Sequence, residues 1–410
     1  MALIIPLGQT AHLPKWQQPK VLLIVMACAM PIAFAVWSAL LNNFVIEVGK
    51  FDGSDNGWLH TVREIPGFLA IGVIALIMFI REQTLGLVSL MLLGVATAIT
   101  AWFPSMAGIL TITMLSSIGF HYYETVNQSL QLQWLTKDEA PRVLGALLAV
   151  GSAATLFAYG AIVITWRTFD LSYNFVYLVS GGITAVMAVA AFFLYPQFES
   201  PNPQIKKFIL RKRYWLYYAL QFMAGARRQI FIVFAGFMMV ERFGFDVHEI
   251  TTLYLINLVI NIVAAPFIGR AVGRFGERNA LIIEYIGLIA VFSAYGGIYV
   301  FGWGVVLASV LYVIDHIFFA MALALKTYFQ KIADPQDIAP TAAVAFTINH
   351  IAAVFLPAAL GYLWLVSPTA VFAFATVMAF GSFVLALFIP RNPHKGNETI
   401  FVARGLAQRA

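Results

Sequence analysis

The chain has 410 residues, of which 61% are hydrophobic and only 11% are charged. Soluble domains carry about 25% charged residues, so this composition excludes a soluble protein and indicates an integral membrane protein. The net charge of +6 does not require a nucleic-acid partner, because the basic residues are sorted by loop, as membrane topology demands. A single cysteine, Cys28, excludes an intramolecular disulfide framework and a cysteine metal site.

Long apolar segments follow one another along the whole chain. A helix needs roughly 20 apolar residues to cross a bilayer, and each segment is about that long or longer. None shows the short alternating pattern of a membrane β-barrel. We therefore predict an all-α membrane protein with twelve transmembrane helices. The expected spans are 20–47, 57–80, 84–103, 105–134, 141–165, 172–195, 214–240, 248–270, 279–300, 303–331, 338–365 and 367–390.

The lysines and arginines between these spans indicate the orientation. One set of loops and both tails carry nearly all of them, whereas the opposite loops carry only Lys50, Arg167 and Arg242. Basic residues concentrate on the cytoplasmic side of membrane proteins, so both termini are expected in the cytoplasm. The predicted location is the plasma membrane, or the inner membrane if the source is a Gram-negative bacterium.

The longest polar connection, from Gln197 to Arg213, splits the spans six and six. The two halves share local features, because Asp138-Glu-Ala-Pro141 precedes the fifth span and Asp337-Ile-Ala-Pro340 precedes the eleventh. These matches predict two parallel six-helix pseudo-repeats. The expected parts are an N-terminal six-helix bundle (1–197), a cytosolic linker (198–213), a C-terminal six-helix bundle (214–392) and a cytosolic tail (393–410).

Two six-helix halves, cytosolic termini and a basic central loop resemble the major facilitator superfamily over nearly the whole chain. The loop motif of that family, G-x-x-x-D-R-x-G-R-R, is nearly absent from the first half, but a closer copy follows the eighth span. It has Gly273 in place of the acid and Glu277 where a base is common. The resemblance implies a conformational role for this loop, formed by Gly269, Arg270, Gly273, Arg274, Gly276 and Arg278.

The apolar stretch Tyr214–Val240 carries Arg227 and Arg228 near its middle. An arginine at that depth is costly unless it faces protein or water, so it is a functional-site candidate by default. Adjacent helix positions point about 100° apart, so one of the two is expected to bind an anionic group. The other can instead pair with Asp315 or Glu64 and hold helices together.

Other polar residues inside the spans complete the candidate site. The resemblance implies that the first, fourth, seventh and tenth helices line a central cavity. Most of the polar and charged residues inside the spans lie on these four helices. On the fourth, His121, Glu124 and Gln128 share one face. The residues expected to bind substrate are Arg227, Arg228, Arg63, Tyr122, Asn257 and Asn349. Those expected to carry coupling protons are Glu124, Asp315, His121, His316 and His350.

Each of these residues also has a structural interpretation. Glu124 and Asp315 can serve as counter-ions of the arginines, or as desolvated acids that take up a proton. The histidines can bond one helix to another, and Arg63 can act as a gate or contact Glu47 or Glu64. No H-x-x-x-H or E-x-x-H spacing occurs among the candidates, so no metal site is expected.

The sequence therefore predicts a secondary active transporter that moves a small organic anion by alternating access with proton coupling. Multidrug efflux by proton antiport is one alternative, and a non-transporting assembly factor or sensor on the same scaffold is another. No nucleotide-binding G-x-x-x-x-G-K-[ST] motif and no catalytic arrangement occur in the sequence, so neither a cofactor nor an enzyme is expected. The expected partners are the bilayer, the solute and protons, with function as a monomer.

Overall fold

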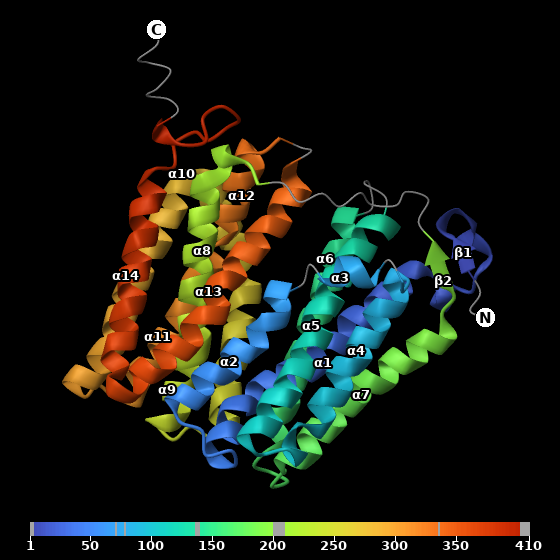
Figure 1. Ribbon diagram of the computed structural model, residues 1–410, viewed down its shortest axis with the longest axis horizontal. Helices are drawn as coiled ribbons and strands as arrows, with labels where there is room; N and C mark the ends of the chain where they lie inside the picture. The colour runs from blue at the N-terminus through green and yellow to red at the C-terminus, as the bar shows by residue number, and fades with distance from the viewer. Residues whose placement is uncertain are drawn as a thin grey trace. The chain divides into compact units, whose positions relative to one another are not determined.

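The computed structural model describes residues 4–69, 72–77, 79–135, 140–199, 210–334 and 337–401. These residues are helical almost throughout (Figure 1). Ten helices in the described part are long and apolar enough to cross a membrane, which confirms the all-α membrane class. The count of twelve spans and the cytoplasmic termini stay predictions. Residues 200–209 of the expected linker, 402–410 of the expected tail and Asp138 of the repeated motif lie outside the described residues.

Two compact units make up the chain. The first comprises Met1–Phe51, Val62–Ile205 and Phe245–Leu255, and the second comprises Asp52–Thr61, Lys206–Gly244 and Ile256–Ala410. The division into bundles at 197 and 213 stays a prediction, and we describe each unit by itself.

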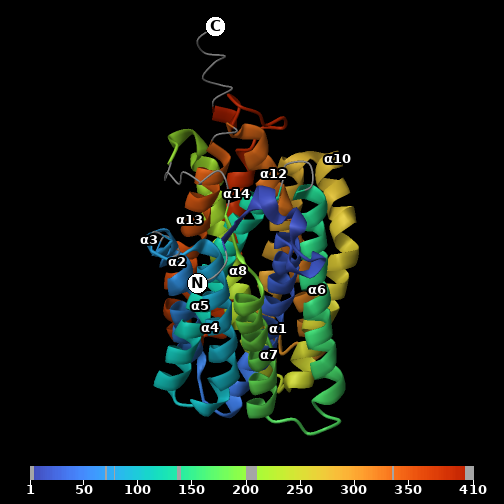
Figure 2. The ribbon, with the colours of Figure 1, turned by 90° about the vertical axis from the view of Figure 1, so that its right-hand side faces the viewer.

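Helices α1 and α4 organise the first unit. α4 packs on α5 and α7, and α1 runs between α6 and α7 (Figure 2). Leu22, Met26, Leu90 and Tyr123 lie in its core with 0–1% of their surface exposed. The first unit contains α1 (Pro19–Glu47), α3 (Gly72–Leu76), α4 (Glu82–Ile99), α5 (Met106–Trp134), α6 (Ala140–Thr165) and α7 (Tyr173–Leu194). A short parallel pair, β1 (Ile4–Pro6) and β2 (Gln197–Glu199), lies beside these helices.

Helix α8 organises the second unit by packing on α13 and α14. A Cβ atom at Gly225 of α8 would collide with the backbone of Asn349 on α13, so glycine permits this close approach. The second unit contains α8 (Trp215–Ile230), a π-helical segment (Phe231–Ala235), α9 (Gly236–Glu241), α11 (Val305–Ala320), α12 (Leu323–Ile332), α13 (Ile338–Val366) and α14 (Pro368–Leu387).

Two helices contribute to both units and differ from the expected spans. The segment expected as one span at 57–80 forms α2 (Gly53–Phe68) and the short α3. Pro66 lies inside α2 and lacks the amide that would continue the helix, and α2 ends two residues later. The eighth and ninth expected spans both lie in α10 (Val247–Phe301), and Gly276, whose φ of 79° is not helical, separates the two helical parts.

The last helix of each expected repeat starts in the same way. The Ser172 hydroxyl accepts a hydrogen bond from the amide of Phe175 at the start of α7. The Ser367 hydroxyl accepts one from the amide of Ala370 at the start of α14. Such caps satisfy amides that the first helical turn leaves without partners. The matching caps agree with the predicted repeat.

Charged side chains tie the ends of α8, α12 and α13 together in the second unit. Arg211 donates two hydrogen bonds to Asp337, each 3.1 Å long. Asp334 lies 2.5 Å from both Nη2 of Arg213 and Nζ of Lys395. The positive and negative charges balance in this helix-end cluster, which consists of Arg211, Arg213, Lys395, Asp334, Asp337 and Glu398.

Candidate functional site

A buried ion pair joins α8 to α10 in the second unit. Nη1 of Arg227 lies 3.5 Å from Oε1 of Glu284, and the two side chains are 4% and 1% exposed. The guanidinium carbon of Arg227 lies 4.5 Å from the centroid of the Tyr285 ring, within cation–π range. Arg227 is thus held by two successive residues of α10.

Asp315 on α11 adds a second carboxylate. It is 1% exposed, and its electrostatic partners are Arg227 and Glu284. Oδ1 of Asp315, Oε2 of Glu284 and Nε of Arg227 are buried and have no hydrogen-bond partner among the described residues. Buried polar atoms are normally hydrogen-bonded, so such atoms call for a functional explanation. We refer to Arg227, Glu284 and Asp315 as the buried charge cluster.

Two of the helices that carry the cluster are irregular close to it. The π-helical segment Phe231–Ala235 follows directly after α8. α11 ends at Ala320, and α12 begins at Leu323 after a short break. π-helical turns and interrupted membrane helices occur frequently at functional sites. The irregular geometry is therefore a second sign, independent of the charges, that this region is functional.

Arg228 has a different environment from Arg227. It is partly exposed, whereas Arg227 is buried, as expected for neighbours that point about 100° apart on a helix. The sequence interpretation named Asp315 or Glu64 as the ion-pair partner of an arginine. The direct partner of Arg227 is Glu284, and Asp315 acts on it as a more distant charge.

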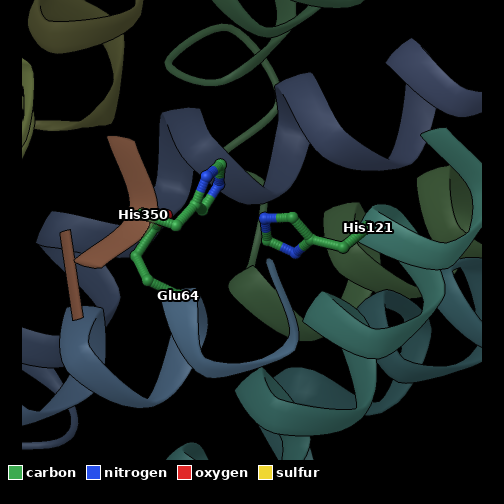
Figure 3. Close-up of side chains that lie close together, drawn as sticks. All are labelled: Glu64, His121 and His350. Carbon is green, nitrogen blue, oxygen red and sulfur yellow. The ribbon is translucent and has the colours of Figure 1, made fainter. Parts of the chain in front are cut away.

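Polar side chains of α2 and α5 meet in the first unit. Arg63 and Glu64 form an ion pair with 2.5 Å between Nη2 and Oε1. Ser117 donates a hydrogen bond to the backbone carbonyl of Arg63, and its hydroxyl lies 2.9 Å from Nδ1 of His121. Glu64 and His121 have ligand-capable atoms within 4.8 Å of each other (Figure 3, which also draws His350 of the second unit).

Glu124 lies on α5, one turn from His121. Its side chain is partly exposed and hydrogen-bonds to Gln128. Tyr122 is partly exposed as well, whereas Tyr123 is buried and donates a 2.9 Å hydrogen bond to the carbonyl of Met26 on α1. The polar face expected on this helix is therefore present, and its acid has a neutral hydrogen-bond partner.

A family model described as Major Facilitator Superfamily matches residues 21–357, which is most of the chain. The protein belongs to the Major Facilitator Superfamily. This match confirms the resemblance to the superfamily that the two six-helix halves and the basic central loop indicated. As a member of this family, the chain is a multi-pass membrane transporter. No curated protein matches the sequence.

Solved structures of this superfamily have the same fold. A mutant of the nucleoside transporter NupG aligns with a TM-score of 0.74 and 14% identity, covering 90% of this chain and all of NupG. A bacterial homologue of the iron transporter ferroportin aligns with a TM-score of 0.69 and 10% identity over 90% of this chain and 98% of its own. A bacterial homologue of the lysosomal transporter Spinster gives 0.65 and 11%, with 90% and 95% covered. At these identities the likeness concerns the fold alone.

Other candidate residues of this superfamily member make local hydrogen bonds. Asn349 donates a 3.1 Å hydrogen bond to the carbonyl of Gln221 and so joins α13 to α8. Nδ1 of His350 lies 2.8 Å from the carbonyl of Phe346, one turn earlier on α13. Oδ1 of Asn257 on α10 is buried and has no hydrogen-bond partner among the described residues.

His316 belongs to the surroundings of the buried charge cluster. It follows Asp315 on α11, and its ring centroid lies 6.2 Å from that of Phe231 in the π-helical segment. The candidate residues brought together in the second unit are therefore Arg227, Asp315 and His316, and those brought together in the first are Glu64 and His121.

The loop motif expected between two spans lies inside α10. Gly276 breaks the helix there, and Glu277, which stands where the family often has a base, is 2.6 Å from Nζ of Lys331 at the end of α12. Arg270 and Arg274 lie over the rings of Phe267 and Phe275. An ion pair made by the acid joins this segment to α12, and the role of the motif in conformational change stays a prediction.

Glu284 is the functional candidate that the sequence reasoning missed. It is an acid near the middle of the apolar span Phe267–Phe301, so the rule that singled out Arg227 applies to it equally. Its span is not among those that the resemblance implies to line the cavity. The element α10 covers the eighth and ninth expected spans, which are outside the cavity-lining set. The contribution of Glu284 therefore depends on how α10 packs against α8.

Proposed function

We propose that this protein transports a small organic anion by alternating access, with protons as the coupling ion. The observation that carries the proposal is the buried pair of Arg227 and Glu284 with Asp315 beside it, near the middle of three candidate spans. A buried ion pair is seldom retained for stability, because apolar residues of similar volume often stabilise a protein as much. A transporter has a use for it, since a guanidinium can bind a carboxylate or phosphate group in two-pronged fashion.

Further residues support the same function. Arg228 is a partly exposed cation. Oδ1 of Asn257 is a buried polar atom that has no hydrogen-bond partner among the described residues. Glu124, His121, His316 and His350 remain candidates for proton transfer, and Arg63, Tyr122 and Asn349 remain candidates for solute binding. The structures with the same fold include a nucleoside transporter and a homologue of an iron transporter, so the fold does not indicate a substrate and the proposed substrate class rests on the residues of this chain.

One observation favours a second candidate function, the export of cationic compounds. The buried charge cluster contains two carboxylates and one guanidinium, and such an excess of negative charge can attract a lipophilic cation. Competition distinguishes the two functions. Organic anions should displace a bound reporter ligand from an anion transporter, whereas lipophilic cations should displace it from an exporter of the second kind.

The test of the anion proposal is transport by reconstituted Arg227→Ala and Arg228→Ala protein. We expect Arg227→Ala to lower anion uptake by at least about 30-fold, as the loss of a buried charge contact costs about 2–5 kcal/mol. Arg242→Ala is the matched control, since Arg242 is an exposed arginine just after α9, and it should keep wild-type rates. Undiminished transport in both test variants, with folded protein in the membrane, would overturn the proposal.

A further inference from the structure

The buried charge cluster has a charge imbalance. It consists of one guanidinium and two carboxylates, all at most 4% exposed, and the guanidinium contacts the carboxylate of Glu284. If all three groups were ionised, the cluster would carry one uncompensated negative charge. An unpaired ion in a low-dielectric interior is so costly that the group takes up a proton or acquires a counter-ion instead.

The surroundings of the cluster do not remove this imbalance. The charge that acts on Glu284 is Arg227, and the charges that act on Asp315 are Arg227 and Glu284. Among the described residues, the neighbouring titratable groups include Tyr285 and Tyr295 of α10 and His316 on α11, and the neighbouring cation on α8 is Arg228, which is partly exposed. Phenols are neutral at physiological pH, so the two tyrosines add no charge to the cluster. His316 is half-buried and lies beside the Phe231 ring.

The hydrogen-bonding pattern shows where an additional cation fits. Oε2 of Glu284 and Oδ1 of Asp315 are buried acceptors without a partner among the described residues. A metal cation takes about six oxygen ligands, whereas a proton needs only one acceptor. The nearby guanidinium also repels a metal ion. The chemistry therefore favours a proton.

We propose that Glu284 and Asp315 together hold one proton at neutral pH, while Arg227 neutralises the remaining carboxylate. The inference deepens the proposed function, because it names the site of the coupling ion. It also explains how Arg227 becomes available to a substrate. When the proton resides on Glu284, its carboxyl no longer competes for the guanidinium, and an anionic solute can bind there. Loss of the proton restores the pair and releases the solute.

This assignment differs from one in which Glu124 carries the proton. Glu124 is partly exposed and has Gln128 as a neutral hydrogen-bond partner. Its ionised form is therefore less penalised than a second carboxylate inside the buried charge cluster. The two assignments make opposite predictions for variants at Glu124 and Glu284.

The experiment is infrared difference spectroscopy of the purified protein, which reports the carbonyl stretch of a protonated carboxyl group. The wild type should show such a band at neutral pH. Glu284→Gln and Asp315→Asn should each abolish it, because the remaining carboxylate then balances Arg227. Arg227→Gln should roughly double it, because both carboxyls then need a proton. Glu124→Gln is the matched control and should retain it.

A band that persists unchanged in both Glu284→Gln and Asp315→Asn would overturn the inference, as would a band that disappears in Glu124→Gln. Sodium is tested by thermal unfolding in sodium chloride and in choline chloride at equal ionic strength. A stabilisation specific to sodium that Glu284→Gln removes would assign the site to that ion and reject the proton. The spectra need no substrate, so a failure of the anion proposal in the transport assay would leave their result intact.

Discussion

The second unit contains two charge clusters that differ in balance and in setting. The helix-end cluster pairs Arg211, Arg213 and Lys395 with three carboxylates through contacts of 2.5–3.9 Å. The buried charge cluster has one cation for two carboxylates, and both carboxylates keep an oxygen without a hydrogen-bond partner among the described residues. At the helix ends every cation has a carboxylate partner, so this cluster serves to hold the helices together. In the interior two carboxylate oxygens have no hydrogen-bond partner among the described residues, so the buried charge cluster can still accept a ligand.

The largest effect should come from removing the cation of the buried charge cluster. Arg227→Met should lower the free energy of unfolding by about 3 kcal/mol, because the one carboxylate that Arg227 neutralises loses its counter-charge. The double variant Arg227→Met/Glu284→Gln should recover at least half of that loss, measured by denaturant unfolding in detergent. Arg242→Met is the control, and its cation–π contact with Tyr299 is worth about 1 kcal/mol or less. A double variant no more stable than Arg227→Met would show that the cluster is not electrostatically coupled.

A smaller effect is expected at the helix ends. Asp337→Asn should lower the unfolding temperature by roughly 3–6 °C, because Arg211 loses its two charged hydrogen bonds. The Asp337 side chain has only 1% of its surface exposed, but it lies among charged groups rather than in apolar core, so its loss should cost less than that of Arg227. Lys395→Ala is the control, since Lys395 is 66% exposed and should change little. Equal effects of Asp337→Asn and Lys395→Ala would show that the buried Asp337 contributes no more to stability than the exposed Lys395.

The smallest effect is a pH dependence of the helix-end cluster. Hydrogen bonds from Arg211 hold the pKa of Asp337 below its ordinary value of 3.8 although burial opposes this, and Lys395 lowers the pKa of Asp334. A lowered pKa in the folded state adds stability that is complete above the unfolded value and is lost as the pH falls through the folded value. The unfolding temperature should therefore decline by a few degrees below about pH 3.8, and Asp334→Asn/Asp337→Asn should flatten this decline. An identical acid response in the double variant would contradict the assignment.

Much of the fold could be predicted from the sequence because apolar length and helix signals are local. The eleventh span was expected at 338–365 and α13 is Ile338–Val366, while the sixth was expected at 172–195 and α7 is Tyr173–Leu194. The second span was expected at 57–80, and its described residues form α2, which contains Pro66, and the short α3. The polar, glycine-rich stretch between the eighth and ninth expected spans does coincide with a break, because Gly276 has a non-helical backbone inside α10.

The sequence predicts two residues of the candidate site but not how they are arranged. The cost of charge in an apolar span singles out Arg227 and Asp315 without any structure. Their relation to Glu284 depends on how α8, α10 and α11 pack, and no spacing along the chain encodes that. Asn349 and His350 illustrate the converse, because polar residues in a span can be engaged by backbone carbonyls that the sequence does not reveal.

The π-helical segment Phe231–Ala235 has a consequence for the phase of the helix that contains it. A π-turn takes in one residue more than an α-turn, so the side chains after it are displaced by roughly 100° from the direction that a regular helix would give them. Residues on either side of Phe231 that share a heptad position therefore do not share a face. Phe234, inside the π-helical segment, and Phe237, which follows it, both lie close to Trp364, at 5.3 and 6.0 Å between ring centroids. The added residue thus lets one helix direct Arg227 at α10 and an aromatic pair at α13.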